Sequence, residues 1–226
     1  MKILLICDDY WHPGQTPIDG VEPLKERGFS FDIITDAKDF KPETLADYSA
    51  VILSKCDEVS QAERVSWKTD AVQQAFIDYV EGGGGLLVTH SGVVAGKNTK
   101  ALDRLIGARF VYHPNACPVL VQPVKVHPVA ENVAAFTEID EHYRLEVSAP
   151  DADIFLASYS PPQGEEAKYG EDPYNNTPAW ICPAGYTRTQ GKGRVCVLSP
   201  GHLTPVWLNP QYQRTLENAL KWCAGE

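Results

Sequence analysis

Histidine side chains follow three apolar segments of this sequence, at the point where each segment gives way to a turn. His12 comes after residues 2–7, His90 after residues 86–88 and His202 after residues 194–198. Each segment is typical of a strand buried in a parallel sheet. Ligands bind at the carboxyl ends of such strands, so we expect the three imidazoles to lie along one edge of the sheet.

Carboxylates, hydroxyls and aromatic rings accompany these histidines, some beside them and some in later clusters expected to fold over the same edge. We predict that the chemistry is carried by His90, His113, Glu141 and His202. We predict that the substrate is lined by Asp8, His12, Ser91, Asp140, Tyr143 and Trp180. His127 and His142 are expected to be surface or turn residues, outside the site.

Two kinds of chemistry suit this set of side chains. Histidine titrates near neutral pH and is the commonest protein ligand for metals. His90, His113, Glu141 and His202 can therefore bind a divalent, zinc-like ion with a position left open for substrate. The same groups can act as general acid and base without a metal. The sequence has no HExxH or similar close spacing, so it leaves both alternatives open.

Composition limits the class of protein and of ligand. The chain has 226 residues, 43% of them hydrophobic, with 20 basic and 30 acidic side chains and a formal net charge of −10. This length predicts a single domain over residues 1–226. The acidity disfavours binding to nucleic acid, and no apolar stretch is long enough to span a membrane. We expect a small-molecule ligand instead.

The cysteines and the N-terminus indicate the compartment. Six cysteines are scattered along the chain and none forms a CxxC pair, which predicts buried thiols in a reducing cytoplasm. The apolar run at residues 2–7 is too short for a signal peptide and is followed at once by acidic residues.

The elements expected around the site follow an α/β pattern that predicts a doubly wound sheet. Strands are expected at residues 2–7, 29–35, 48–53, 86–88, 154–159, 179–182 and 194–198, and helices at 17–27, 70–81, 98–106 and 210–224. Residues 110–126 contain three prolines and predict antiparallel or edge strands. Residues 160–178 are polar and rich in Pro and Gly, which predicts a long mobile loop, of the kind that often forms a functional lid.

An ordered set of short motifs over most of the chain resembles the ThuA-like (trehalose utilisation) family. The motifs are GGGGLLVTHSG at 82–92, Phe110 with His113-Pro114, His127-Pro128, 140–143, 178–180, GKGRVCVLSPGH at 191–202, Trp207, Pro210 and 218–222. The resemblance implies a flavodoxin-like fold of the class I glutamine amidotransferase type, in which helices flank a parallel sheet. The residues between the helix after the central strand and the last strands would form an irregular β-rich insertion.

The resemblance also implies a function in carbohydrate utilisation. Relatives are associated with trehalose and related disaccharides and with sugar oxidoreductases that make 3-keto sugars, so we expect a sugar or keto-sugar ligand and a functional link to such an oxidoreductase. Trp11, Tyr143, Trp180 and Trp207 offer faces on which a sugar ring can stack. Related folds suggest a homodimer.

The residues at the turn after the central strand separate this chain from glutamine amidotransferases, which place a nucleophilic cysteine there. His90 occupies that position, followed by Ser91 and Gly92. Without a thiolate at the turn, glutamine hydrolysis is not expected. The α-protons of a keto-sugar are acidic, so isomerisation, epimerisation or elimination is expected instead. The alternative is a non-catalytic sugar-binding or regulatory module that kept the fold.

Overall fold

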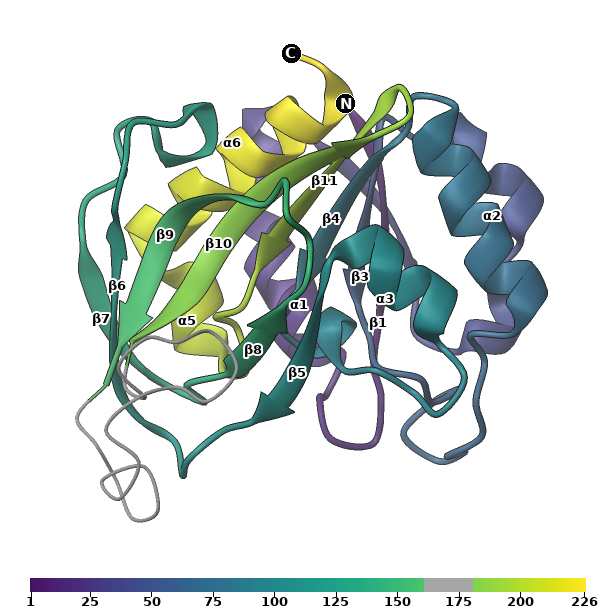
Figure 1. Ribbon diagram of the computed structural model, residues 1–226, viewed down its shortest axis with the longest axis horizontal. Coiled ribbons are helices and arrows are strands. Elements are labelled where there is room, and N and C mark those ends of the chain that lie inside the picture. Colours follow the sequence, from purple (N-terminus) through teal and green to yellow (C-terminus); the bar gives the residue numbers. More distant parts are fainter. Residues whose placement is uncertain (161–180) are drawn as a thin grey trace.

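A large mixed sheet runs through the middle of the molecule, with helices on both faces (Figure 1). It is seen in a computed structural model, which describes residues 1–160 and 181–226. Within these residues the sheet has nine strands in the order β2-β1-β3-β4-β11-β10-β9-β6-β7, and β5 and β8 form a separate two-stranded sheet.

The elements have the following bounds. The strands are β1 (Lys2–Cys7), β2 (Ser30–Ile34), β3 (Ala50–Ser54), β4 (Gly85–Thr89), β5 (Ala108–Tyr112), β6 (Cys117–Pro123), β7 (Phe136–Asp140), β8 (Arg144–Val147), β9 (Asp153–Tyr159), β10 (Ile181–Gln190) and β11 (Gly193–Leu198). The α-helices are α1 (Gln15–Val21), α2 (Asp70–Glu81), α3 (Lys100–Ile106), α5 (Thr204–Leu208) and α6 (Pro210–Ala224). Short 3-10 turns are η1 (Glu22–Arg27), η2 (Ala37–Asp39), η3 (Pro42–Asp47), η4 (His90–Val93) and η5 (Pro128–Ala130).

The strands β2, β1, β3, β4 and β11 pair in parallel. The edge strand β2 is partly exposed, whereas β1, β3, β4 and β11 are covered on both faces. Their side chains alternate between two apolar cores. Ile3 and Leu5 of β1 pack in the core under α1, α5 and α6, and Leu4 and Ile6 pack in the core under α2 and α3 (Figure 1). Burial on both faces explains why these strands are continuous apolar runs in the sequence. The predicted α/β fold with a parallel sheet between helices is confirmed.

The insertion extends this sheet. Strand β10 precedes β11 and is joined to it by a tight turn at Gly191, and β9, β6 and β7 continue the sheet in antiparallel pairing. The β5–β8 pair has a register shift between Phe110 and Tyr112. This pair brings the segments after β5 and before β8 together. Most of the predicted loop at 160–178, and Trp180, lie outside the described residues.

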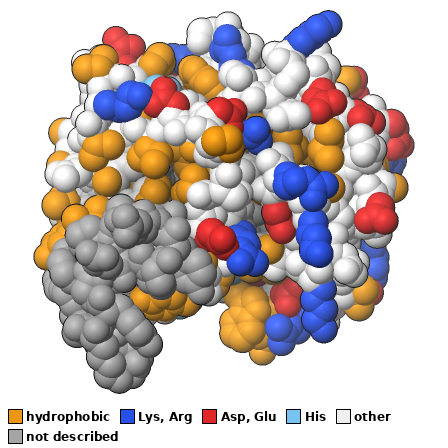
Figure 2. Space-filling model, in the orientation of Figure 1, with side chains coloured by type: hydrophobic (Ala, Val, Ile, Leu, Met, Phe, Trp, Pro, Cys, Tyr) orange, Lys and Arg blue, Asp and Glu red, His pale blue; other side chains and the backbone are white. Residues whose placement is uncertain are grey.

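The described part of the chain contains no helix that is long and apolar enough to cross a membrane. Acidic and basic side chains are intermingled over the face shown in Figure 2, between hydrophobic ones. All six cysteines are buried.

Candidate active site

Three imidazole rings meet at the carboxyl ends of the parallel strands. His12 lies in the loop after β1, His90 directly follows β4, and His202 lies in the loop after β11. The ring centroids of His12 and His90 are 5.2 Å apart, those of His12 and His202 5.4 Å, and those of His90 and His202 5.3 Å. The structure therefore brings together the three histidines that strand order placed on one edge.

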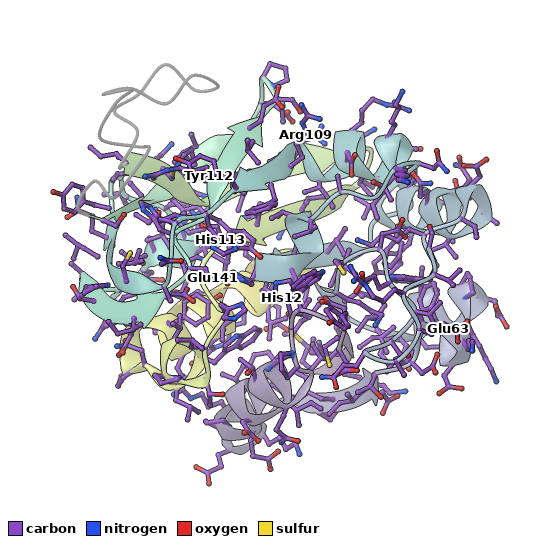
Figure 3. All side chains as sticks on the ribbon, turned by 90° about the horizontal axis from the view of Figure 1, so that it is seen from below. His12, Glu63, Arg109, Tyr112, His113 and Glu141 are labelled. Atoms are coloured by element: carbon purple, nitrogen blue, oxygen red, sulfur yellow. The ribbon has the colours of Figure 1, made fainter. Side chains whose placement is uncertain are left out.

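Glu141, which follows β7, extends its carboxylate to these rings. Its Oε2 is 3.1 Å from His202 Nδ1 and 3.4 Å from His90 Nε2. Its Oε1 is 3.4 Å from His113 Nε2. Figure 3 shows Glu141 between His12 and His113. One carboxylate from the insertion thus touches histidines from three separate segments.

The ligand atoms of His12, His90, Glu141 and His202 all lie within 4.8 Å of one another. Within the described residues, His90 Nε2, Glu141 Oε2 and His202 Nδ1 are buried and have no hydrogen-bond partner. Buried polar atoms without a partner are rare, and here three of them converge.

This donor set fits a divalent metal ion. Imidazole and carboxylate together suit zinc and neighbouring transition metals. Ligand atoms about 2.1 Å from a zinc ion lie roughly 3–3.5 Å from one another, and the separations of Glu141 Oε2 from His90 Nε2 and His202 Nδ1 are 3.4 and 3.1 Å. A bound ion would satisfy all three unpartnered atoms at once.

Neighbouring groups fix the orientation of two of these rings. Asp9 Oδ1 is 2.7 Å from His12 Nδ1, and the backbone oxygen of Ser199 is 2.9 Å from His90 Nδ1. Each contact holds a proton on Nδ1 and leaves Nε2 with its lone pair towards the cluster. Carboxylates and carbonyls that hold the second nitrogen of a histidine are typical of metal sites. Tyr143 also contributes, with its hydroxyl 3.0 Å from His12 Nε2 and its ring 3.9 Å from that of His90.

The charges in the cluster support one another. Burial alone would raise the pKa of Glu141, but the nearby imidazoles of His202 and His90 outweigh burial and hold that pKa well below its usual value. The Glu141 carboxylate, whose Oε2 is 3.1 Å from His202 Nδ1, raises the pKa of His202. Burial lowers the pKa of His90 to about 4, so this ring is neutral at pH 7. The ionised Glu141 carboxylate and the neutral His90 imidazole are the forms that bind metals, and His202 would give up a proton on binding an ion.

The backbone at His90 and the close packing of Gly92 on β3 make the turn after β4 tight. His90 has a φ of +37°, a conformation that L-residues rarely adopt. A Cβ atom on Gly92 would lie 2.2 Å from the backbone oxygen of Leu53, so only glycine fits beside β3. Strained residues of this kind cluster at functional sites. The turn therefore resembles, in its backbone, the strained turn that carries the nucleophile in other α/β enzymes.

A cavity of about 470 Å³ opens onto the cluster. Its walls combine apolar and polar side chains: Trp11, His12, Val94, Phe110, His113, Glu141, Tyr143 and His202. A few polar groups in a partly apolar pocket of this size are typical of a small-molecule site.

The other predicted site residues lie around the cluster in different ways. Asp140 is buried and accepts hydrogen bonds from the backbone N–H groups of Gly201 and His202, at 2.8 and 2.9 Å. It therefore fixes the loop that carries His202. Ser91 is buried, and its hydroxyl has no partner in the part of the chain that the structure describes. Asp8 accepts a hydrogen bond from the backbone N–H of Gly14 and does not line the cavity.

Three expectations from the sequence need correction. His142 is 1% exposed and contacts the hydroxyls of Ser158 and Ser160, and His127 is 9% exposed, so neither is a surface residue, although His127 caps the 3-10 turn η5. Trp207 is fully buried and donates its indole N–H to the backbone oxygen of Gly201. It cannot offer a face to a sugar.

Asp9 was not predicted as a site residue, and His12 was predicted to line the substrate and not to bind the metal. In the structure His12 belongs to the group of four ligand atoms, whereas His113 contacts it through Glu141. The spacing of Asp9 and His12 could have indicated this pair, because residues three apart in one turn let the carboxylate reach the ring.

Comparison with known proteins gives one family. The model of the ThuA family, described as trehalose utilisation, matches residues 4–223. No curated protein matches the sequence.

Solved structures with the same fold cover nearly the whole chain. A ThuA-like protein from Parabacteroides merdae has a TM-score of 0.75 and 18% identity, over 100% of this chain and 90% of its own. A ThuA-like protein from Bacteroides uniformis has a TM-score of 0.68 and 23% identity, over 99% and 91%. A protein from Salmonella typhimurium, named as cytoplasmic, has a TM-score of 0.66 and 17% identity, over 99% of each chain. The TM-scores show that these proteins share the fold of this chain.

Proposed function

We propose, from the premise that this chain belongs to the ThuA (trehalose utilisation) family, that it is an enzyme of carbohydrate utilisation acting on a sugar or keto-sugar. A disaccharide such as trehalose, or its 3-keto derivative, is the substrate class that we favour. We further propose that His12, His90, Glu141 and His202 hold a divalent, zinc-like ion. The cytoplasmic location expected from the sequence remains part of this proposal.

One observation carries the metal proposal. Within the described residues, the buried atoms His90 Nε2, Glu141 Oε2 and His202 Nδ1 converge without hydrogen-bond partners. Leaving buried polar groups unpaired costs about 1–3 kcal/mol each. An ion at their meeting point removes this penalty, and Asp9 and Ser199 already orient two of the rings for it.

When bound there, such an ion would polarise a sugar carbonyl or hydroxyl as a Lewis acid. The residues of this chain would bind and orient the sugar in the cavity, with the rings of Trp11 and Tyr143 as apolar walls. His113 is suited to move a proton, because its side chain is 33% exposed and its Nε2 is 3.4 Å from Glu141 Oε1. Its Nδ1 is 2.8 Å from the backbone oxygen of Pro114, which fixes the ring.

These roles favour reactions at the carbon next to a sugar carbonyl. A base at His113 Nε2 can take up an acidic α-proton and return it to the same or a neighbouring atom. Epimerisation and isomerisation follow from such proton transfers, and elimination follows when a group leaves instead. Glutamine hydrolysis is not proposed, because His90 stands at the turn where a thiolate would be needed.

The proposal is tested by metal analysis and by turnover of keto-sugars. Metal content is measured by mass spectrometry for the wild type, for Glu141→Gln and for His127→Asn, a control histidine that lies outside the cluster. We expect a stoichiometric ion in the wild type and the control, and its loss in Glu141→Gln. Purified protein is then incubated with 3-keto-trehalose and 3-keto-glucose, and products are followed by NMR.

The outcomes separate the alternatives. A wild type that neither contains nor takes up zinc, manganese, iron or nickel would remove the metal and leave acid–base chemistry by the same histidines. Sugar binding without any product would instead favour the non-catalytic sugar-binding module. Absence of both binding and product would overturn the assignment to sugars.

A further inference from the structure

A second cavity of about 440 Å³ lies beside the one at the histidine cluster. Trp11 and Val94 line both cavities, so these two residues form the boundary between them. Trp11 is 57% exposed although it is a large aromatic side chain. We propose that the second cavity is a subsite for the second ring of a two-ring sugar, with Trp11 as the wall that both rings contact.

The position of Trp11 is fixed by its surroundings. Its backbone N–H donates to Asp9 Oδ1 at 3.0 Å, and the same carboxylate oxygen holds His12. The neighbouring N–H of Tyr10 donates to Glu58 Oε2 at 3.1 Å. The backbone that carries Trp11 is therefore fixed between Asp9, which holds His12, and Glu58, which lines the second cavity.

A cation packs on the exposed aromatic rings. The guanidinium of Arg64 lies 4.3 Å from the ring centre of Tyr10 and 5.1 Å from that of Trp11. Its Nε donates to Glu58 Oε1 at 2.8 Å. A cation–π contact at an exposed site stabilises such an arrangement modestly. A preformed wall of this type lowers the entropy lost when a ligand binds.

The second cavity differs from the first in its chemistry. It has no histidine among its lining residues, and the first cavity has three. Its wall instead offers carboxylate, amide, hydroxyl and ammonium groups from Asp57, Ser66, Lys97 and Asn98. Groups that donate and accept hydrogen bonds, next to an aromatic face, suit a ring that carries several hydroxyls. The first cavity would do chemistry on one ring, and the second would hold the other.

Two segments that line the second cavity, residues 94–98 and the loop with Asp57, pack closely on each other. A Cβ atom on Gly96 would lie 2.0 Å from Asp57 Oδ2, so the 94–98 segment packs directly on this carboxylate. Asp57 also accepts hydrogen bonds from Ser66 Oγ at 2.7 Å and from the backbone N–H of Lys68 at 2.9 Å. The wall of the second cavity is thus tied together across three segments of the chain.

This inference rests on the proposed function, because it assigns the two rings of one sugar to two cavities. The test compares one-ring and two-ring ligands in the wild type, in the double variant Lys97→Ala/Asn98→Ala, and in Ser66→Trp, which fills the second cavity. Lys100→Ala is the control, an exposed lysine that lines neither cavity. Turnover of 3-keto-glucose and 3-keto-trehalose is measured, and binding of glucose and trehalose is measured by calorimetry.

We expect the double variant to lose about tenfold in kcat/KM for the two-ring substrate, as for one or two lost hydrogen bonds. Ser66→Trp should lose more, and both should keep the wild-type value for the one-ring substrate. Equal effects on both substrates, or no effect on either, would overturn the subsite.

The binding measurement separates this inference from the proposed function. If no keto-sugar is turned over but trehalose binds more tightly than glucose, and this preference is lost in both variants, the subsite stands and the catalytic proposal fails. If the wild type turns over both substrates and the variants show no change in preference, the catalytic proposal stands and the subsite fails. If neither sugar binds and none is turned over, both fail.

Discussion

Asp9 and His12 form a contact of 2.7 Å between Oδ1 and Nδ1 within a single turn, and this contact connects the first strand to the candidate metal site. Asp9 is fully buried, and its other oxygen accepts a hydrogen bond from the backbone N–H of Cys56 at 3.0 Å. Burial alone would raise the pKa of Asp9, but the hydrogen bond with His12 and those from backbone N–H groups outweigh burial and lower it to about 2. Asp9 therefore stays ionised at neutral pH and holds His12 Nε2 towards the cluster.

We predict that Asp9→Asn weakens metal binding without removing a ligand. Loss of such an outer partner typically lowers metal affinity by roughly 10–100-fold. The measurement is the dissociation constant for Zn²⁺, by competition with a chelator. Asp8→Asn is the matched control, because Asp8 bonds to the N–H of Gly14 and lies outside the group of four ligand atoms. Equal affinities for wild type and Asp9→Asn would contradict this role of Asp9.

Metal binding should raise the thermal stability of the protein. An ion that binds only the folded state adds about 4 kcal/mol when present at roughly 1,000 times its dissociation constant. For a chain of this length, that corresponds to a rise in Tm of about 8–16 °C. We expect this rise on adding Zn²⁺ to the chelator-treated wild type and its absence in His90→Ala/His202→Ala. A similar rise in that double variant would show that the ion binds elsewhere.

Gly92 should be required for the turn that carries His90. In Gly92→Ala the new methyl group would meet the backbone oxygen of Leu53 at 2.2 Å. We expect a loss of about 3 kcal/mol in the free energy of unfolding, as for overpacking against rigid groups, and a weaker affinity for metal. Gly28→Ala is the control, because its φ of +89° is strained but nothing lies within 4 Å.

That control should lose only about 1 kcal/mol, from the left-handed backbone alone, and should keep its metal affinity. The measurement is urea unfolding together with the chelator competition. If both variants lose the same stability and both keep the metal, the contact between Gly92 and β3 does not position His90.

The sequence predicted the edge of the sheet on which the three histidines meet, but not every side chain around them. Apolar runs followed by histidine were enough to bring His12, His90 and His202 to one edge, because all three follow parallel strands. Periodicity could not show which of Asp8 and Asp9 turns inward. Asp8 has a φ of +75°, which a strand pattern does not predict, and the fully buried residue is its neighbour Asp9.

The insertion was harder to predict because its contacts are between residues distant in sequence. β6 pairs with β7 and with β9, and β9 pairs with β10, so neither the extension of the sheet nor the position of Glu141 follows from local pattern. His127 was predicted to be a surface or turn residue. The structure packs its ring on Phe155 at 4.6 Å, where local sequence gives no sign of burial.

His127 leads to a prediction for the pH dependence of stability. Its Nε2 is 3.0 Å from Thr187 Oγ1, and its Nδ1 accepts the backbone N–H of Val129 at 3.1 Å. The charged groups near the ring are Asp153, with Oδ2 3.9 Å from Nε2, and Lys125. Burial lowers the pKa of His127, the charge of Lys125 lowers it further and Asp153 opposes them, so the folded protein favours the neutral ring.

The direction in which the free energy of unfolding changes with pH follows from the difference in the pKa of His127 between the folded and unfolded chain. The unfolded chain takes up a proton at His127 near its ordinary pKa of about 6.5, and the folded chain does so only at lower pH. The neutral ring therefore contributes its full stability above about pH 6.5, and this contribution is lost as the pH falls. His127→Asn removes the titrating group, so its free energy of unfolding should fall less between pH 7 and pH 5 than that of the wild type. The difference should not exceed about 1.4 kcal/mol per pH unit. Urea unfolding at several pH values measures both curves, and parallel curves for the two proteins would show that the folded environment leaves the titration of His127 unchanged.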